Sequence, residues 1–247
     1  MSRRILIVAL LMSALVAGPP PDYRPEPALT PPSFTFARLM YSGGGWRRGS
    51  WATDYPKADI QFIYGLQKFS DFSFIDSDHR TVALQDPELF DYPFLYAVEV
   101  GYMRLSDSDA ARLREYLLRG GFLVADDYHG EYEFESFRSE MQKVFPEYVA
   151  IDLPPTHPIF HCYYDIDRLF QVPGIQYLRS GRTWEKGGFQ PRFMGIHDDG
   201  GRLMVMINHN VDLGDAWEWA EVQEYPREFA TLAFELGSNY IVYAMTH

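Results

Sequence analysis

The chain has 247 residues, a formal net charge of −12 and a single cysteine. This length, with 47% hydrophobic residues, suits one large globular domain with a substantial core. The acidic balance argues against nucleic-acid binding and against a polybasic membrane contact, because both depend on positive charge. One cysteine also excludes an internal disulfide.

Residues 1–18 have the pattern of a secretory signal peptide. Arg3 and Arg4 precede an almost uninterrupted apolar run from Ile5 to Val16, and two small residues follow. The run is short for a membrane span, so we expect cleavage and export, either to the periplasm or out of the cell. An uncleaved N-terminal anchor is the alternative. Cleavage would remove two positive charges and change the net charge from −12 to −14.

Residues 19–32 are dense in proline, which predicts an extended linker without a fold of its own. The remainder, residues 33–247, is then one α/β domain. It begins with a predicted strand from Phe34 to Met40.

A glycine-rich run follows this first strand. Its residues are Gly43, Gly44, Gly45, Trp46 and Arg47. Glycines at the carboxyl end of a strand allow a ligand to approach the backbone closely, and the arginine could hold an anion. The spacing matches no phosphate-binding motif, so a simple tight turn is the alternative.

The next elements are a helix from about Asp54 to Phe69 and a strand from Phe74 to Leu84. A second unit has an apolar strand from Phe94 to Val100 and a helix capped by Ser106. It ends with the apolar strand Phe122–Ala125. Two buried strands joined by a helix predict a parallel pair, and ligands of such sheets bind beyond the carboxyl ends of the strands.

The rest of the chain predicts a helix from Glu133 to Phe145 and an antiparallel hairpin of Phe193–Ile196 with Arg202–Ile207. The chain closes with a helix from about Pro226 to Ala244. A last strand over residues 239–243 is the alternative for the end of this helix. These elements predict an α/β fold with a mostly parallel sheet and a C-terminal hairpin.

Several short motifs occur in a characteristic order. They are Gly-Gly-Trp at 44–46, Leu-Arg-Glu-Tyr-Leu-Leu-Arg-Gly-Gly-Phe-Leu-Val-Ala-Asp-Asp at 113–127, His-Pro-Ile-Phe at 157–160, Asp-Leu-Gly-Asp-Ala-Trp at 212–217, and Leu-Gly-Ser-Asn at 236–239 followed by Val-Tyr-Ala. With them the chain resembles an uncharacterised bacterial family, the domain of unknown function 4159, over residues 34–246. That family is similar in fold to class I glutamine amidotransferases, so the resemblance implies a single flavodoxin-like domain. It implies no activity, substrate or cofactor.

The resemblance also bears on catalysis. In the amidotransferase fold a nucleophilic cysteine stands on a sharp turn directly after the strand that corresponds here to Phe122–Ala125. This chain has Asp127, Tyr128, His129 and Gly130 in that region, and Cys162 lies far beyond it. We therefore expect no glutaminase activity.

Three groups of acidic and histidine residues are candidate sites. They are Asp126, Asp127, His129 and Glu131; His157, His161 and Asp165; and His209, Asp212, Asp215 and Glu218. If they converge at one sheet edge, they could bind Zn²⁺, Mn²⁺ or Ca²⁺ and support hydrolysis of an ester, amide or glycosidic bond. The structural alternative is that these side chains cap helices and order turns. Asp126 and Asp127 are neighbours in a strand, so they should point to opposite faces.

Trp217 and Trp219 flank Glu218, and we expect them to form an exposed binding surface in a loop. The leading hypothesis is a domain that binds a small ligand or an envelope protein. Its predicted binding residues are Gly43, Gly44, Gly45, Trp46, Arg47, Asp126, His209, Asp212, Asp215, Trp217 and Glu218. The alternative is a hydrolase, metal-dependent or based on an Asp and His pair, with Asp127 or His129 as general base and Arg47 holding an anion.

Overall fold

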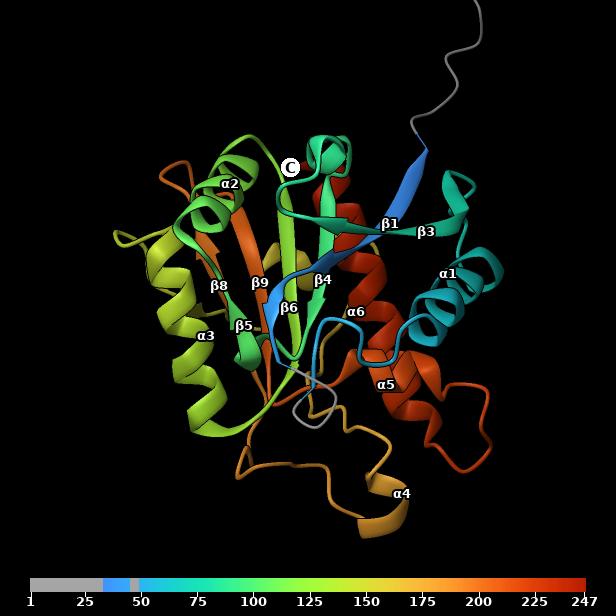
Figure 1. The fold of residues 1–247 in the computed structure, drawn as a ribbon. Coiled ribbons are helices and arrows are strands. Elements are labelled where there is room, and N and C mark those ends of the chain that lie inside the picture. Colours follow the sequence, from blue (N-terminus) through green and yellow to red (C-terminus); the bar gives the residue numbers. More distant parts are fainter. Residues whose placement is uncertain (1–32, 45–48) are drawn as a thin grey trace, which may run out of the picture. The chain divides into compact units, whose positions relative to one another are not determined.

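The computed structural model of the protein describes residues 33–44 and 49–247. The predicted signal peptide, the proline-rich linker and the candidate residues Gly45, Trp46 and Arg47 lie outside these ranges. The described residues form a seven-stranded sheet with helices packed on both faces (Figure 1). This architecture confirms the predicted α/β fold with a mostly parallel sheet.

The sheet has the strand order β3-β1-β4-β6-β9-β8-β7. The strands are β1 (Phe34–Met40), β3 (Ile75–Ala83), β4 (Phe94–Val98), β6 (Phe122–Tyr128), β7 (Ile151–Asp152), β8 (Arg192–His197) and β9 (Leu203–His209). A separate short ladder joins β2 (Ser42–Gly43) to β5 (Met103–Arg104).

The described residues also form six α-helices and three short 3₁₀ helices. They are α1 (Lys57–Phe69), α2 (Asp107–Leu118), α3 (Gly130–Val144), α4 (Tyr177–Ser180), α5 (Leu213–Glu218), α6 (Arg227–Thr246), η1 (Pro87–Asp91), η2 (Val100–Tyr102) and η3 (Pro158–Phe160). Ser106 caps α2 with a capping box to Asp109, and this confirms the predicted start of that helix.

β4 and β6 pair in parallel, as their apolar sequences and the intervening helix predict. β1 is parallel to β3 and β4, and β6 is parallel to β9, so the carboxyl ends of β1, β4, β6 and β9 meet at one edge. The hairpin of β8 and β9 is antiparallel, as predicted. Helices α4 and α5 lie beyond the shared edge, at the lower side of Figure 1.

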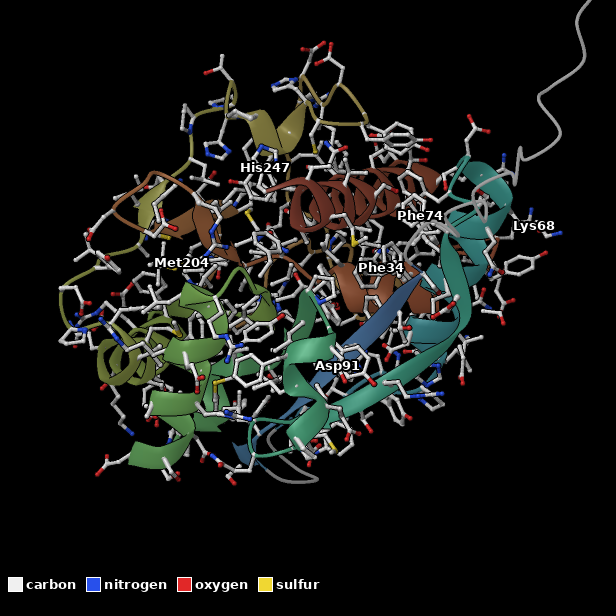
Figure 2. All side chains as sticks on the ribbon, turned by 90° about the horizontal axis from the view of Figure 1, so that it is seen from above. Phe34, Lys68, Phe74, Asp91, Met204 and His247 are labelled. Atoms are coloured by element: carbon white, nitrogen blue, oxygen red, sulfur yellow. The ribbon has the colours of Figure 1, made fainter. Side chains whose placement is uncertain are left out.

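The sheet separates two apolar cores because successive side chains of each strand point to opposite faces. Phe94, Tyr96 and Val98 point to the core beneath α1, α5 and α6, whereas Leu95 and Ala97 point to the core beneath α2 and α3. Figure 2 looks from the opposite end of the sheet, where Phe34 and Met204 lie near the starts of β1 and β9, and side chains fill both layers.

The C-terminal segment is a continuous helix, α6, rather than a helix followed by a strand. Gly237 does not interrupt it. A methyl group on Gly237 would lie 2.6 Å from the ring of Phe62 and 2.9 Å from that of Trp217, so the glycine permits close packing of α6 on α1 and α5. In the described part of the chain, no helix is both long and apolar enough to cross a lipid bilayer.

Candidate functional site

The site begins with a β-bulge at the end of β6. Ala125 is paired with Ile207 and Tyr128 with His209, so β6 carries one more residue than β9 in this interval. Asp127 adopts a left-handed conformation there, with φ of 50°. The side chains of Asp126 and Asp127 consequently lie in different environments, as expected for neighbours in a strand.

Asp126 is a fully buried structural carboxylate. Its oxygens accept hydrogen bonds from the Tyr96 hydroxyl (2.6 Å), the Asn208 amide (3.2 Å) and the backbone N–H groups of Leu213 (2.9 Å) and Gly214 (3.3 Å). Burial raises the pKa of Asp126 to about 6, and these hydrogen bonds oppose the rise. Asp126 therefore fixes the start of α5 against β6 rather than facing a ligand.

Left-handed backbone is concentrated at this edge. The non-glycine residues with positive φ in the described ranges are Asp54, Glu99, Asp127, Lys186 and Asn210. Glu99 N–H donates to the carbonyl of Asp127, and the side chain of Lys186 pairs with Glu99. Such conformations are unfavourable for residues with a Cβ, and they gather at functional sites where the fold holds them.

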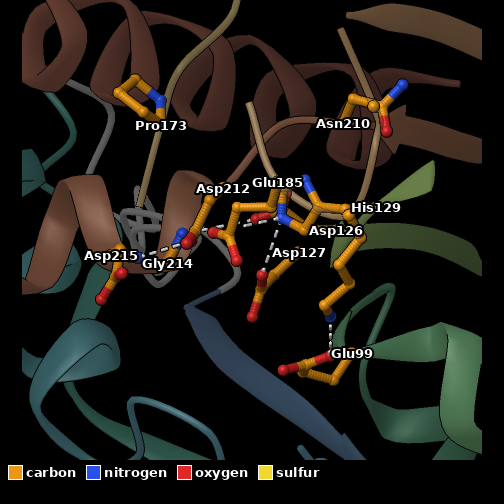
Figure 3. A network of polar contacts seen from close by, with 12 residues as sticks. Glu99, Asp126, Asp127, His129, Pro173, Glu185, Asn210, Asp212, Gly214 and Asp215 are labelled. Carbon is orange, nitrogen blue, oxygen red and sulfur yellow. Dashed lines mark hydrogen bonds and ion pairs between the residues drawn. The ribbon is translucent and has the colours of Figure 1, made fainter. Parts of the chain in front are cut away.

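Asp127, His129 and Asp212 form a buried triad, shown in Figure 3. Their exposed fractions are 6%, 2% and 3%, and one potential ligand atom from each lies within 4.8 Å of the others. His129 Nε2 is 3.3 Å from Asp127 Oδ1 and 3.9 Å from Glu185 Oε1. Asp212 caps α5 by accepting from the Asp215 N–H at 2.8 Å.

A second triad, Asp54, Asp215 and Glu218, is partly exposed and also has ligand atoms within 4.8 Å of one another. Both oxygens of Asp215 are engaged, by the Ile175 N–H at 2.6 Å and by the Trp219 indole N–H at 3.0 Å. Helix α5 supplies Asp215 and Glu218, and Asp54 lies just before α1.

Lys186 forms ion pairs with two carboxylates beside the triads. Its Nζ lies 2.7 Å from Glu133 Oε1 and 3.7 Å from Glu99 Oε2. Glu133 also accepts from the His129 N–H at 2.7 Å, which fixes the start of α3. Most of the negative charge at this edge therefore has no ammonium or guanidinium partner within the described structure.

The pKa shifts follow from this imbalance. Burial, reinforced by repulsion from neighbouring carboxylates, raises the pKa values of Asp54, Asp127 and Asp212 well above the usual range. Burial raises the pKa of Glu99 to about 7, opposed by the Lys186 charge. Burial also lowers the pKa of His129 to about 3, so its imidazole is neutral at pH 7 and able to bind a metal.

Three polar atoms at this edge are buried and have no hydrogen-bond partner among the described residues. They are Asp54 Oδ2, Glu99 Oε2 and His129 Nδ1. Buried polar atoms in native proteins are nearly always paired, so each unpaired one calls for a cause. Their position together in one acidic group makes this edge a candidate position for a cation or another ligand.

The family described as "Domain of unknown function (DUF4159)" matches residues 35–245. The chain belongs to this family. No curated protein matches the chain. Family membership brings no assigned activity, so the chemistry of this member has to be inferred from the edge described above.

The structure brings together five of the residues that the sequence singled out. Asp127 and His129 meet Asp212 in the buried triad, and Asp215 and Glu218 lie in the neighbouring one. Gly43 belongs to the β2–β5 ladder, and Gly44 packs against Gly49. Trp46 and Arg47, like Gly45, lie outside the described residues, so the anion site at this loop stays a prediction.

The expected exposed surface at Trp217 is wrong. Trp217 is 1% exposed and stacks on Phe62 with 4.0 Å between ring centroids, because residues 213–218 form helix α5 rather than a loop. Trp219 is half-buried, with Lys57 over its ring and its indole N–H on Asp215. These tryptophans fix α5 in the core instead of forming a binding surface.

His209 contributes to the support of the site rather than to either triad. Its ring lies between Tyr128 and Phe134, and Nε2 contacts the Gly130 carbonyl at 3.1 Å. The second predicted group divides in two: His161 and Asp165 form a surface cluster with Asp167, whereas His157 contacts His197 with 3.5 Å between their Nε2 atoms.

The sequence analysis missed Asp54, Glu99, Glu133, Glu185 and Lys186. Glu99 could have been found, because it lies near the carboxyl end of a predicted parallel strand. Glu185 and Lys186 lie in a long irregular segment between β7 and β8 and reach the edge only through tertiary folding.

Proposed function

We propose that this protein is an exported ligand-binding domain whose site depends on a divalent cation held by Asp127, His129 and Asp212. The observation that carries the proposal is a group of buried carboxylates built on left-handed backbone, which within residues 33–44 and 49–247 has few cationic partners and contains polar atoms without a hydrogen bond. The binding domain expected from the sequence is thereby assigned a specific chemistry, the binding of a divalent cation.

A divalent cation would resolve the repulsion that raises the pKa values of Asp127 and Asp212. Two carboxylates and a neutral imidazole are ligands of Mn²⁺ and Zn²⁺, and carboxylates also suit Ca²⁺. Two ligand atoms of one such ion are at most about 4–5 Å apart, and the triad meets this limit because its ligand atoms lie within 4.8 Å of one another. The remaining negative charge favours a ligand that offers neutral hydroxyl or carbonyl oxygens.

The cation site is tested by isothermal titration of Mn²⁺, Zn²⁺ and Ca²⁺ into chelator-stripped protein lacking residues 1–18. We expect saturable binding that Asp127→Asn and Asp212→Asn weaken at least tenfold. Asp165→Asn, in the separate surface cluster, is the matched control and should bind as the wild type does. Equal affinity in all four proteins would reject the proposed site.

A second candidate function is hydrolysis, favoured by the buried contact between His129 and Asp127. A neutral imidazole beside a carboxylate is able to accept a proton from a nucleophile, and a bound divalent cation would polarise the bond to be cleaved. Chromogenic esters, amides and glycosides tested with Mn²⁺ should reveal turnover that His129→Gln abolishes. If none of the three classes is turned over, the binding domain is preferred.

Export is proposed from the pattern of residues 1–18. Intact mass and N-terminal sequencing of protein recovered from the periplasm or medium should show a chain that starts near residue 19. Retention of Met1 on membrane-bound protein would instead indicate an uncleaved anchor.

We further propose that the domain is related in fold to the class I glutamine amidotransferases. The mostly parallel sheet and the sharp left-handed turn at Asp127 support this relationship. An envelope protein is proposed as an alternative to a small ligand.

A further inference from the structure

The second triad lies next to the first across the start of α5. A methyl group on Gly174 would lie 2.5 Å from Asp212 Oδ2 and 2.7 Å from Asp215 Oδ2, so these two oxygens face the same small space. Asp212 belongs to the first triad and Asp215 to the second, so the two triads adjoin at this point. They form one continuous acidic edge rather than two isolated groups.

The side chain of Asp54 provides a separate reason to regard the second triad as a ligand-binding position. Its Oδ2 atom is buried and has no hydrogen-bond partner among the described residues, although its backbone is held in the left-handed region at φ of 61°. A methyl group on Gly214 would lie 2.9 Å from this oxygen, so the glycine leaves room beside it. A buried, unpaired carboxylate oxygen is costly unless a proton or a cation satisfies it.

We propose that this edge holds two neighbouring divalent cations, the second bound by Asp54, Asp215 and Glu218. The inference rests on the proposed function for the first cation, at Asp127, His129 and Asp212. The second position offers only carboxylate oxygens, which suit Mn²⁺, Mg²⁺ and Ca²⁺ better than Zn²⁺. Mn²⁺ is the ion whose preferences fit both positions.

Two adjacent cations would extend the chemistry of the edge. A pair of cations can hold two oxygens of one ligand, with one oxygen on each ion. The partly exposed second triad would face the incoming ligand, and the buried first triad would lie behind it. A ligand with two neighbouring hydroxyl or carbonyl oxygens matches this arrangement.

The test is the number of Mn²⁺ ions bound per chain, measured by equilibrium dialysis and elemental mass spectrometry on chelator-stripped protein lacking residues 1–18. We expect two ions in the wild type and one in Asp54→Asn. Glu218→Gln, which changes no capping or backbone contact in the described structure, should also bind one. Asp215 is left unchanged because its oxygens hold Ile175 and Trp219.

The outcomes separate this inference from the proposed function. One ion in the wild type that Asp127→Asn removes and Asp54→Asn keeps would overturn the second position and leave the first intact. No ion in the wild type would overturn both. Two ions that persist in Asp54→Asn and Glu218→Gln, but of which Asp165→Asn loses one, would assign the second ion to the surface cluster and overturn the inference. Circular dichroism and melting temperature establish that each variant is folded.

Discussion

Asp127 illustrates how a single backbone conformation assigns a carboxylate to a site. The bulge at the end of β6 turns its side chain toward His129 and Asp212, while the preceding Asp126 stays in the core with Tyr96 and Asn208. The two residues are chemically identical, but only Asp127 lies in the triad with His129 and Asp212.

The Asp127→Asn variant should be more stable than the wild type when no cation is present. Asparagine removes one buried negative charge and keeps the size of the side chain. We expect the free energy of unfolding at pH 7.5 with chelator to rise by about 1–3 kcal/mol. Urea unfolding measures it, and Asp165→Asn should change it by less than about 0.5 kcal/mol. Destabilisation by Asp127→Asn would show that the carboxylate has a stabilising structural role.

The protein should lose stability in acid because of the histidine pair His157 and His197. Burial lowers the pKa of both imidazoles below the unfolded value near 6.5, and Asp198 opposes the shift at His197. The unfolded chain therefore binds more protons, so the contribution of this pair is complete above about pH 6.5 and declines as the pH falls. The urea midpoint should drop more between pH 7.5 and 5.5 in the wild type than in His157→Gln. An equal drop in both proteins would show that the pair does not contribute.

At the scale of elements, the sequence predicts the strands and helices well because their periodicity and caps are local. The capping residues Ser106 and Asp109 indicate the start of α2, and the all-apolar sequences of β4 and β6 indicate a parallel pair of strands. Asp54, Glu185 and Lys186 carry no such signal, because loops bring them to the edge only when the chain has folded. The exposure predicted for Trp217 was wrong because the glycine and aspartates before it are typical of a loop. In the structure Asp212 instead caps a short helix that contains Trp217.

Gly237 in α6 provides a test of helix packing. Alanine normally stabilises a helix relative to glycine by up to about 1 kcal/mol. Here the added methyl group would collide with Phe62 and Trp217, so we expect Gly237→Ala to destabilise the protein by about 1–3 kcal/mol. Thermal unfolding measures the change, and Ser139→Ala on the exposed face of α3 is the control. A stabilising Gly237→Ala would mean that α6 can move away from α1 and α5.

For the whole molecule, the sheet supplies rigid positions and the loops supply charge. The carboxyl ends of β4 and β6 bring Glu99 and Asp127 to one edge, while the start of α5 and the segment between β7 and β8 complete it with Asp212, Glu185 and Lys186. The fold class could therefore be predicted from sequence, but the composition of the site could be predicted only in part.

Cation binding should be visible as global stabilisation. Mn²⁺ at about 100 times its dissociation constant should add about 2.7 kcal/mol for one site, and chelator should reverse the effect. The melting temperature in the presence and absence of Mn²⁺ measures it. Asp127→Asn should respond less than the wild type, and an identical response in both would contradict a cation at the buried triad.

The most direct test of the account is an anomalous difference map from crystals of the protein grown with Mn²⁺. We predict a peak within bonding distance of Asp127, His129 and Asp212. A map with no peak there, or with manganese only at His161, Asp165 and Asp167, would contradict the cation-dependent site.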